Sequence, residues 1–171
     1  MKKTLIESTK YIKDLIKREN VGKDVVDILK FQNSISLTDK HELINKLFNQ
    51  RSAEEILKDG FVTGCTDDAI VFLTLLKALD IEAVYVESLE KNWLDAPMNE
   101  QMIRGHAFVK VGELLIDPQR KVIYIDPNWI KNRYVIYAEG AEPYEFGLTD
   151  FREMVQKFMD YKESYKQSSS N

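Results

Sequence analysis

Hydrophobic residues recur at helical spacing through the first third of the chain, with charged residues between them. From residue 3 to about residue 18 this pattern predicts an amphipathic helix whose apolar face is formed by Leu5, Ile6, Ile12, Leu15 and Ile16. A second helix is predicted after Gly22, and a third after a cap at Thr38 or Asp39. Residues 1–59 are therefore predicted to form a helical N-terminal part.

A short helix is predicted between Ser52 and Gly60, because Ser52 and Glu55 have the spacing of a capping box. After a predicted loop at residues 61–64, residues 69–79 are apolar at almost every position. A helix that is apolar on nearly every side belongs inside a protein. This segment is therefore predicted to be a buried helix.

Later segments alternate between apolar and polar residues and are rich in β-branched side chains, which is typical of strands. Strands are predicted at residues 81–88, 106–111, 114–116, 122–125 and 134–138, with a long loop at 91–105. A last helix is expected within residues 148–166, before a disordered polar tail at 167–171. Helices followed by antiparallel strands predict an α+β fold in one domain, residues 1–166, with its core at residues 60–147.

The strands at 106–111 and 114–116 are predicted to form a hairpin. Glycine at the first position of the Gly112-Glu113 pair suits a type II′ turn. Counting outward from this turn pairs Val109 with Ile116. The same register puts His106 and Asp117 on one face as diagonal neighbours, with Cβ atoms about 7 to 8 Å apart.

Composition and charge exclude several classes of function. The chain has 171 residues, 44% of them hydrophobic, which is enough for one core, and a net charge of −4 without a basic block. Apolar stretches stay short of the roughly 18 residues of a membrane span, and Thr4-Leu5-Ile6 is followed at once by Glu7, so no signal peptide is predicted. We therefore expect a cytoplasmic protein with neither a nucleic-acid nor a membrane partner.

The single cysteine, Cys65, falls at the first turn of the predicted buried helix, in a polar Gly-Cys-Thr-Asp-Asp turn, with Thr63 or Thr66 available as a cap. Free backbone N–H groups and the helix dipole at such a position can lower a cysteine pKa from about 8.5 to between roughly 3.5 and 7.5. The same N–H groups can hold an oxyanion. A lone cysteine is more often a small buried hydrophobe, so position alone leaves both interpretations open.

A nucleophilic cysteine needs a base, and the chain offers two histidines. His41 lies in a charged segment, where a solvated surface role is expected. His106 opens a strand, and Asp117 is placed to orient its ring and fix its tautomer. Asp117 could instead only end a strand, and Asp126, which also precedes a proline, is the alternative orienter.

These residues, in this order, resemble the transglutaminase-like branch of the papain-like fold. Gly64-Cys65-Thr66-Asp67-Asp68-Ala69 resembles the family's cysteine helix, Gly105-His106-Ala107-Phe108-Val109 its histidine strand, and Leu115-Ile116-Asp117-Pro118 its aspartate strand. The chain departs from the family at Asp80, where glycine is usual, and at Phe108, where tryptophan is common. The resemblance covers about residues 60–118.

The resemblance implies acyl chemistry, with Cys65 as nucleophile, His106 as general base and acid, and Asp117 as orienter. The expected substrates are peptides, proteins or small amides, and water or an amine would accept the acyl group. No metal or organic cofactor is implied. The sequence does not decide between the two acceptors.

Two other classes of function stay open at this stage. One is a non-catalytic peptide- or protein-binding module that uses the loop carrying Trp93, Met98 and Met102, which could equally wall a substrate cleft or pack on the sheet. The other is a redox sensor, which lacks a second cysteine to resolve a sulfenic acid. Asp67 could tune the properties of the site. An acid in the first turn of a helix, however, ordinarily serves to interact favourably with the helix dipole.

Overall fold

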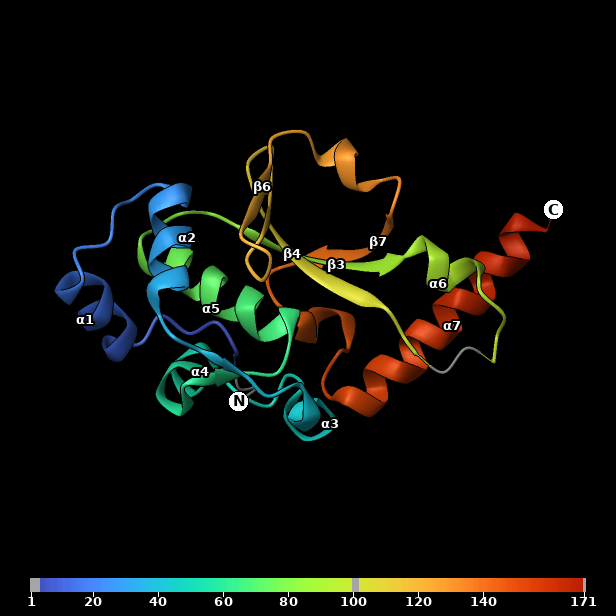
Figure 1. The fold of residues 1–171 in the computed structure, drawn as a ribbon, viewed down its shortest axis with the longest axis horizontal. Coiled ribbons are helices and arrows are strands. Elements are labelled where there is room, and N and C mark those ends of the chain that lie inside the picture. The colour runs from blue at the N-terminus through green and yellow to red at the C-terminus, as the bar shows by residue number, and fades with distance from the viewer. Residues whose placement is uncertain (1–3, 100–101, 171) are drawn as a thin grey trace.

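The computed structural model describes residues 4–99 and 102–170, and its elements follow the predicted order of helices first and sheet later (Figure 1). The helical elements are α1 (Lys10–Arg18), α2 (Val25–Ser34), η1 (His41–Leu43), α3 (Ile44–Leu47), α4 (Ala53–Asp59), α5 (Cys65–Ala78), α6 (Lys91–Asp95), η2 (Pro127–Ile130), η3 (Pro143–Phe146) and α7 (Phe151–Ser169). The strands are β1 (Thr38–Asp39), β2 (Phe61–Val62), β3 (Val84–Glu90), β4 (Gly105–Val111), β5 (Leu114–Asp117), β6 (Val122–Tyr124) and β7 (Tyr134–Gly140).

Five of the strands form an antiparallel sheet in the order β6-β5-β4-β3-β7. Helices α1, α2 and α4 lie on the left of Figure 1, and α7 lies on the right. The predicted α+β fold class is therefore confirmed. In the described ranges, no helix is long and apolar enough to cross a bilayer.

Helix α5 is the centre of the core. Ten of its 14 residues are buried. It contacts β3 and β4 on one side and α1, α2 and α4 on others. The long apolar run that predicted a buried helix thus reflects burial on nearly all sides, and the first turn of α5 lines a pocket.

The predicted hairpin has the predicted register. Val109 pairs with Ile116, and the turn glycine, Gly112, has a φ of 55°, which a residue with a Cβ rarely adopts. Ala107, Val109 and Ile116 belong to the core cluster that contains α5. Because neighbours alternate across a strand, His106 lies on the other face.

The first helix is shorter than predicted. It begins at Lys10, with Thr9 as its side-chain cap, whereas Leu5 and Ile6 lie in a non-helical segment whose side chains are buried in the core. The backbone N–H of Leu5 donates to Glu142 at 2.8 Å. Apolar residues at helical spacing were here a sign of burial alone, and residue 3 lies outside the described residues.

Three short elements replace predicted caps and loops. Thr38 does not cap a helix but pairs in parallel with Phe61, so β1 and β2 occupy segments predicted as a cap and a loop. The following helical turn has Lys40 at its N-cap, without a side-chain bond. The predicted loop at 91–105 begins with helix α6, and residues 100–101 of that loop lie outside the described residues.

The capping box at Ser52 and Glu55 is present, and α4 ends at Gly60 in the left-handed conformation, as predicted. Helix α7 continues to Ser169, so the described part of the predicted disordered tail is helical up to that residue, and residue 171 lies outside the described residues. The side chain of Lys162 on α7 is buried, lies over the ring of Trp93 at 4.6 Å, and donates to the carbonyl of Pro97 at 2.9 Å. These contacts tie α7 to α6 and to the segment that follows it.

A buried polar network fixes the loop that enters α5. Asp67 accepts hydrogen bonds from the backbone N–H of Thr63 at 2.8 Å and from its hydroxyl at 3.0 Å. Arg51 pairs with Asp67 at 2.7 Å and with the more exposed Asp59 at 3.0 Å. Burial raises the pKa of Asp67, although the bonds from Thr63 and the charge of Arg51 oppose that shift. Asp67 therefore holds residues 63–67 in place, in addition to any favourable interaction with the helix dipole.

We expect Asp67→Ala to lower the free energy of unfolding by about 3–5 kcal/mol, because it leaves the buried Arg51 and Thr63 groups without their partner. Asp59→Ala is the matched control, since the side chain of Asp59 is 44% exposed, and it should cost less than about 1 kcal/mol. Urea unfolding of both variants measures the difference. Equal losses would contradict this role for Asp67.

Candidate active site

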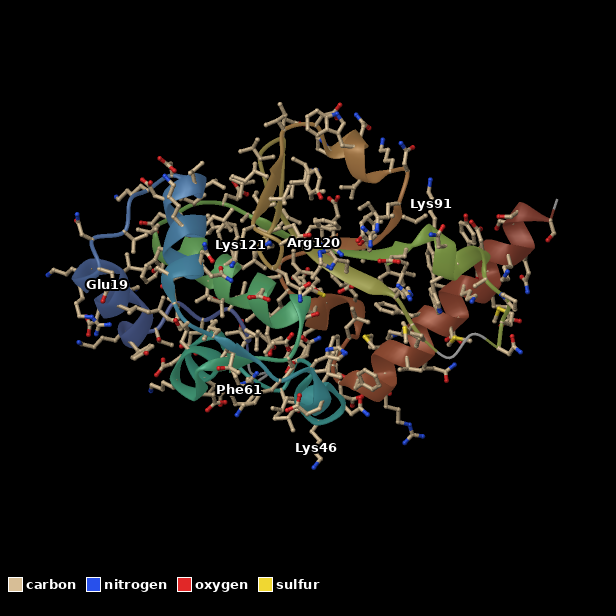
Figure 2. All side chains as sticks on the ribbon, in the orientation of Figure 1. Glu19, Lys46, Phe61, Lys91, Arg120 and Lys121 are labelled. Atoms are coloured by element: carbon tan, nitrogen blue, oxygen red, sulfur yellow. The ribbon has the colours of Figure 1, made fainter. Side chains whose placement is uncertain are left out.

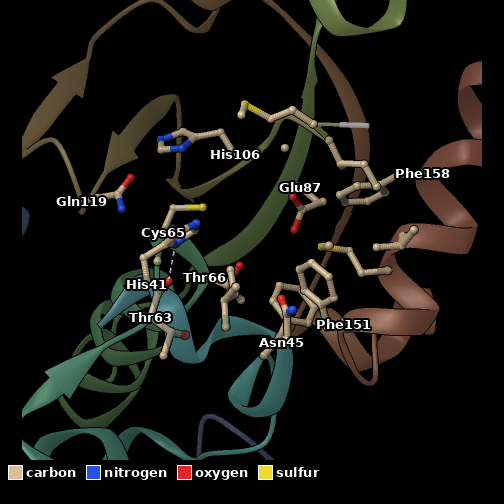
Figure 3. A pocket seen from close by; sticks show the side chains of 18 of the residues that line it. His41, Asn45, Thr63, Cys65, Thr66, Glu87, His106, Gln119, Phe151 and Phe158 are labelled. Atoms are coloured by element: carbon tan, nitrogen blue, oxygen red, sulfur yellow. Dashed lines mark hydrogen bonds between the residues drawn. The ribbon is translucent and has the colours of Figure 1, made fainter. Parts of the chain in front are cut away.

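Cys65, His106 and Asp117 come from α5, β4 and β5 and meet at one end of a pocket of about 550 Å³. Cys65 and His106 line this pocket, and Figure 3 shows both side chains directed into it. Asp117 lies behind His106, fully buried. The structure thus brings together all three residues that the sequence singled out.

The His106–Asp117 contact is a short buried hydrogen bond. Nε2 of His106 lies 2.6 Å from Oδ2 of Asp117, and the two side chains are 4% and 0% exposed. Burial acts to raise the pKa of Asp117, but the hydrogen bond from His106 and further favourable contacts outweigh it, and the net shift is downward. An ionised carboxylate can only accept, so Nε2 carries the proton. Nδ1 is then the basic nitrogen of neutral His106.

Arg120 and Tyr134 also contact this pair, and neither was predicted from the sequence. Arg120 donates to Asp117 through its backbone N–H at 2.9 Å and through its guanidinium at 3.2 Å, and it also donates to the Tyr134 hydroxyl at 2.9 Å. The Tyr134 ring stacks on His106 with centroids 5.8 Å apart. Figure 2 labels Arg120 near the middle of the molecule. The ring and the carboxylate are therefore held from several sides.

The alternative orienter, Asp126, lies elsewhere. Its carboxylate caps the short helix η2 by accepting from the backbone N–H of Asn128 at 2.9 Å. The Asp126-Pro127 pair therefore has a structural role at the start of a turn, which is the role that the sequence left open for both Asp-Pro pairs. Of the two aspartates, Asp117 is the one in contact with His106.

Cys65 opens α5, as predicted, but neither predicted threonine caps the helix. Gly64 is the N-cap residue and makes no side-chain hydrogen bond. Thr63 instead bonds to Asp67. The backbone N–H of Cys65 is among the first N–H groups of the helix, which have no intrahelical acceptor, and it lies at the pocket.

The expected lowering of the cysteine pKa is wrong for this structure. Burial raises the pKa of the Cys65 thiol to about 12, the charge of Glu87 adds to the shift, and the backbone N–H of Ala107 opposes it. The residue keeps part of its surface exposed to the pocket. Desolvation of the thiolate thus outweighs the helix terminus, and the thiol is neutral in the free protein.

Two further titratable residues line the pocket and were not expected there. His41, assigned to the surface, is exposed but also faces the pocket, and its Nδ1 donates to the carbonyl of Thr63 at 3.0 Å. Glu87 is 3% exposed and accepts from the Tyr85 hydroxyl at 2.5 Å. The sequence could have indicated the burial of Glu87. Residues two apart in a strand share one face, so Glu87 lies on the same face as the core residue Tyr85.

The loop residues that were candidates for a cleft wall separate into two groups. Met102 lines the pocket beside Cys65, and it is 62% exposed. Trp93 is 2% exposed and packs in a second core cluster, and Met98 is not among the lining residues. A binding module that uses Trp93 as a docking residue is therefore not supported.

We expect iodoacetamide to alkylate Cys65 with a midpoint well above pH 9, because burial and the nearby Glu87 carboxylate both disfavour the thiolate. Glu87→Gln removes the negative charge and should lower the thiol pKa, which raises the alkylation rate at pH 9 by about 3- to 10-fold. Glu113→Gln makes the same change in the exposed hairpin turn and should have no effect. A wild-type midpoint below pH 8 would contradict the expectation.

Comparison with known proteins gives a likeness of fold. No family model matches the sequence, and no curated protein matches it. A crystal structure described as "a putative cysteine protease" from Cytophaga hutchinsonii superposes with a TM-score of 0.58 at 19% sequence identity. The match covers 85% of this chain and 46% of that one, so this chain spans about half the length of that protein. At this identity, the α+β fold is what the two proteins are shown to share.

Proposed function

We propose that this protein performs cysteine-dependent acyl transfer or hydrolysis on peptide or glutamine-type amide carbonyls, as a member of the transglutaminase-like branch of the papain-like fold. The observation that carries the proposal is the buried Nε2–Oδ2 bond of 2.6 Å between His106 and Asp117, beside a pocket that Cys65 also lines. A cysteine with only a packing role would have no need of a base oriented in this way.

In the proposed reaction, Sγ of Cys65 attacks the carbonyl carbon while Nδ1 of His106 takes the thiol proton. Because the thiol is neutral at rest, this proton transfer accompanies the attack rather than preceding it. Asp117 stabilises the imidazolium through Nε2–H. The negative oxygen of the intermediate would accept from the backbone N–H of Cys65.

Collapse of the intermediate breaks the C–N bond, and the leaving amine takes the proton from Nδ1. A thioester on Cys65 remains, together with neutral His106. Water or an amine then attacks the thioester, with His106 taking the attacking group's proton and returning it to the departing thiolate. Hydrolysis and transfer therefore use the same residues and differ in the acceptor alone.

The test uses N-acetylglutamine p-nitrophenyl ester as acyl donor. We expect one equivalent of p-nitrophenol in a burst and an acyl mass on the peptide that contains Cys65. His106→Ala should lower the acylation rate by about 10²- to 10⁴-fold, because the base is lost. His41→Ala removes the other histidine of the same pocket and should change the rate by less than about tenfold.

A burst that survives Cys65→Ala, or equal effects of the two histidine variants, would refute the proposal. Added ethylamine then identifies the acceptor. Formation of the ethylamide indicates a transferase, and formation of the free acid alone indicates a hydrolase.

A further inference from the structure

The pocket has two chemically different sides. Helix α7 supplies an apolar wall, formed by Phe151, Met154, Val155 and Phe158. Cys65 and His106 lie at the polar end, and Figure 3 shows Glu87 between this end and the apolar wall. A substrate group that enters along α7 therefore meets the Glu87 carboxyl.

The position of Glu87 is built into the fold. Its strand pairs it with Ala107 of β4, and the Tyr85 hydroxyl donates to its Oε2. At Gly105, a Cβ atom would lie 2.9 Å from a ring carbon of Phe158 and 3.3 Å from Oε1 of Glu87. The absence of a side chain at residue 105 thus lets the ring and the carboxyl lie beside the strand.

Glu87 is buried, and the described part of the chain gives it no countercharge. Within residues 4–99 and 102–170, no lysine, arginine or histidine forms an ion pair with it. Burial raises the pKa of Glu87 to about 8, against the bonds from Tyr85 and the backbone of Ser88. The acyl chemistry proposed above does not use this group. A buried carboxylate is costly unless a cation or hydrogen bonds compensate it.

We propose that this pocket binds a substrate side chain with an aliphatic stem and a terminal ammonium, as in lysine, and that Glu87 selects it. The apolar wall of α7 suits the methylene groups of the stem, and the ammonium supplies the countercharge that Glu87 lacks. A neutral side chain of the same length offers no charge that would stabilise the ionised form of Glu87. The inference rests on the proposed function only in taking this pocket as the place where substrate binds.

Binding of the cation is coupled to a proton. Glu87 is mostly protonated at pH 7 and would be ionised beside an ammonium, so about one proton is released per ligand bound. Affinity should rise with pH, approaching tenfold per unit well below pH 8, and level off above it. The titratable groups that lie near Glu87 or line the same pocket are Tyr85 on β3, Cys65 on α5, His106 on β4, Tyr137 on β7, His41 on η1, and Arg120, which pairs with Asp117.

The test is calorimetric binding to the full chain carrying Cys65→Ala, in which no acylation occurs. The ligands are the N-acetyl, N-methylamide derivatives of lysine, norleucine and glutamine. We expect lysine to bind at least about tenfold more tightly than norleucine, with proton release seen as a dependence of the heat on buffer ionisation. Glu87→Gln should abolish both effects, and Glu113→Gln, in the exposed hairpin turn, should preserve them.

Equal binding of lysine and norleucine would overturn the proposal, as would tighter binding of glutamine, absence of any binding, or a lysine preference that survives Glu87→Gln. If Glu87→Gln fails to fold, Tyr85→Phe provides the test. Loss of the Tyr85 hydroxyl raises the pKa of Glu87 further, so lysine affinity should fall at pH 7 and recover by pH 9. Unchanged affinity at pH 7 would contradict the proposal.

The outcomes separate from those of the acylation experiment. Lysine binding to the Cys65→Ala protein does not depend on acyl chemistry, and a failed acylation assay would leave it standing. Acylation of Cys65 without a lysine preference would support the reaction and refute this specificity.

Discussion

Helix α5 is apolar on nearly every side, so it is stable only where the sheet covers one side and α1, α2 and α4 cover others. This packing brings the N-terminal end of the helix to the start of β4. Asp67 then ties the entering loop to the helix through Thr63 and Arg51. The proximity of Cys65 and His106 is thus a consequence of core packing.

Local rules predicted the parts of the fold that depend on neighbours in sequence. The capping box at Ser52 and the hairpin register at Gly112 needed only a few adjacent residues. The pairing of Thr38 with Phe61 joins segments 23 residues apart, and two-residue strands are too short to show alternation. Leu5 has the spacing of a helical residue but is buried in a non-helical segment, because burial alone sets its apolar character.

The three proposed catalytic positions could be found from sequence because few side chains suit each role and a hairpin register links His106 to Asp117. Arg120 and Tyr134 could not, since their contacts depend on how a turn and a distant strand approach that hairpin. The position of Cys65 at a helix terminus also led to a wrong prediction, that the pKa of the thiol would be lowered. The effect of the terminus is local, whereas the desolvation that dominates at Cys65 depends on the whole pocket.

Helix α7 contributes an apolar wall to the pocket, while Cys65, His106 and Asp117 come from α5, β4 and β5. The buried Lys162 fastens this helix to Trp93 of α6 and to Pro97 after it. The apolar wall and the three proposed catalytic positions thus lie in different stretches of the chain. Substitutions within residues 151–158 would therefore reshape one wall of the pocket and leave Cys65, His106 and Asp117 in place.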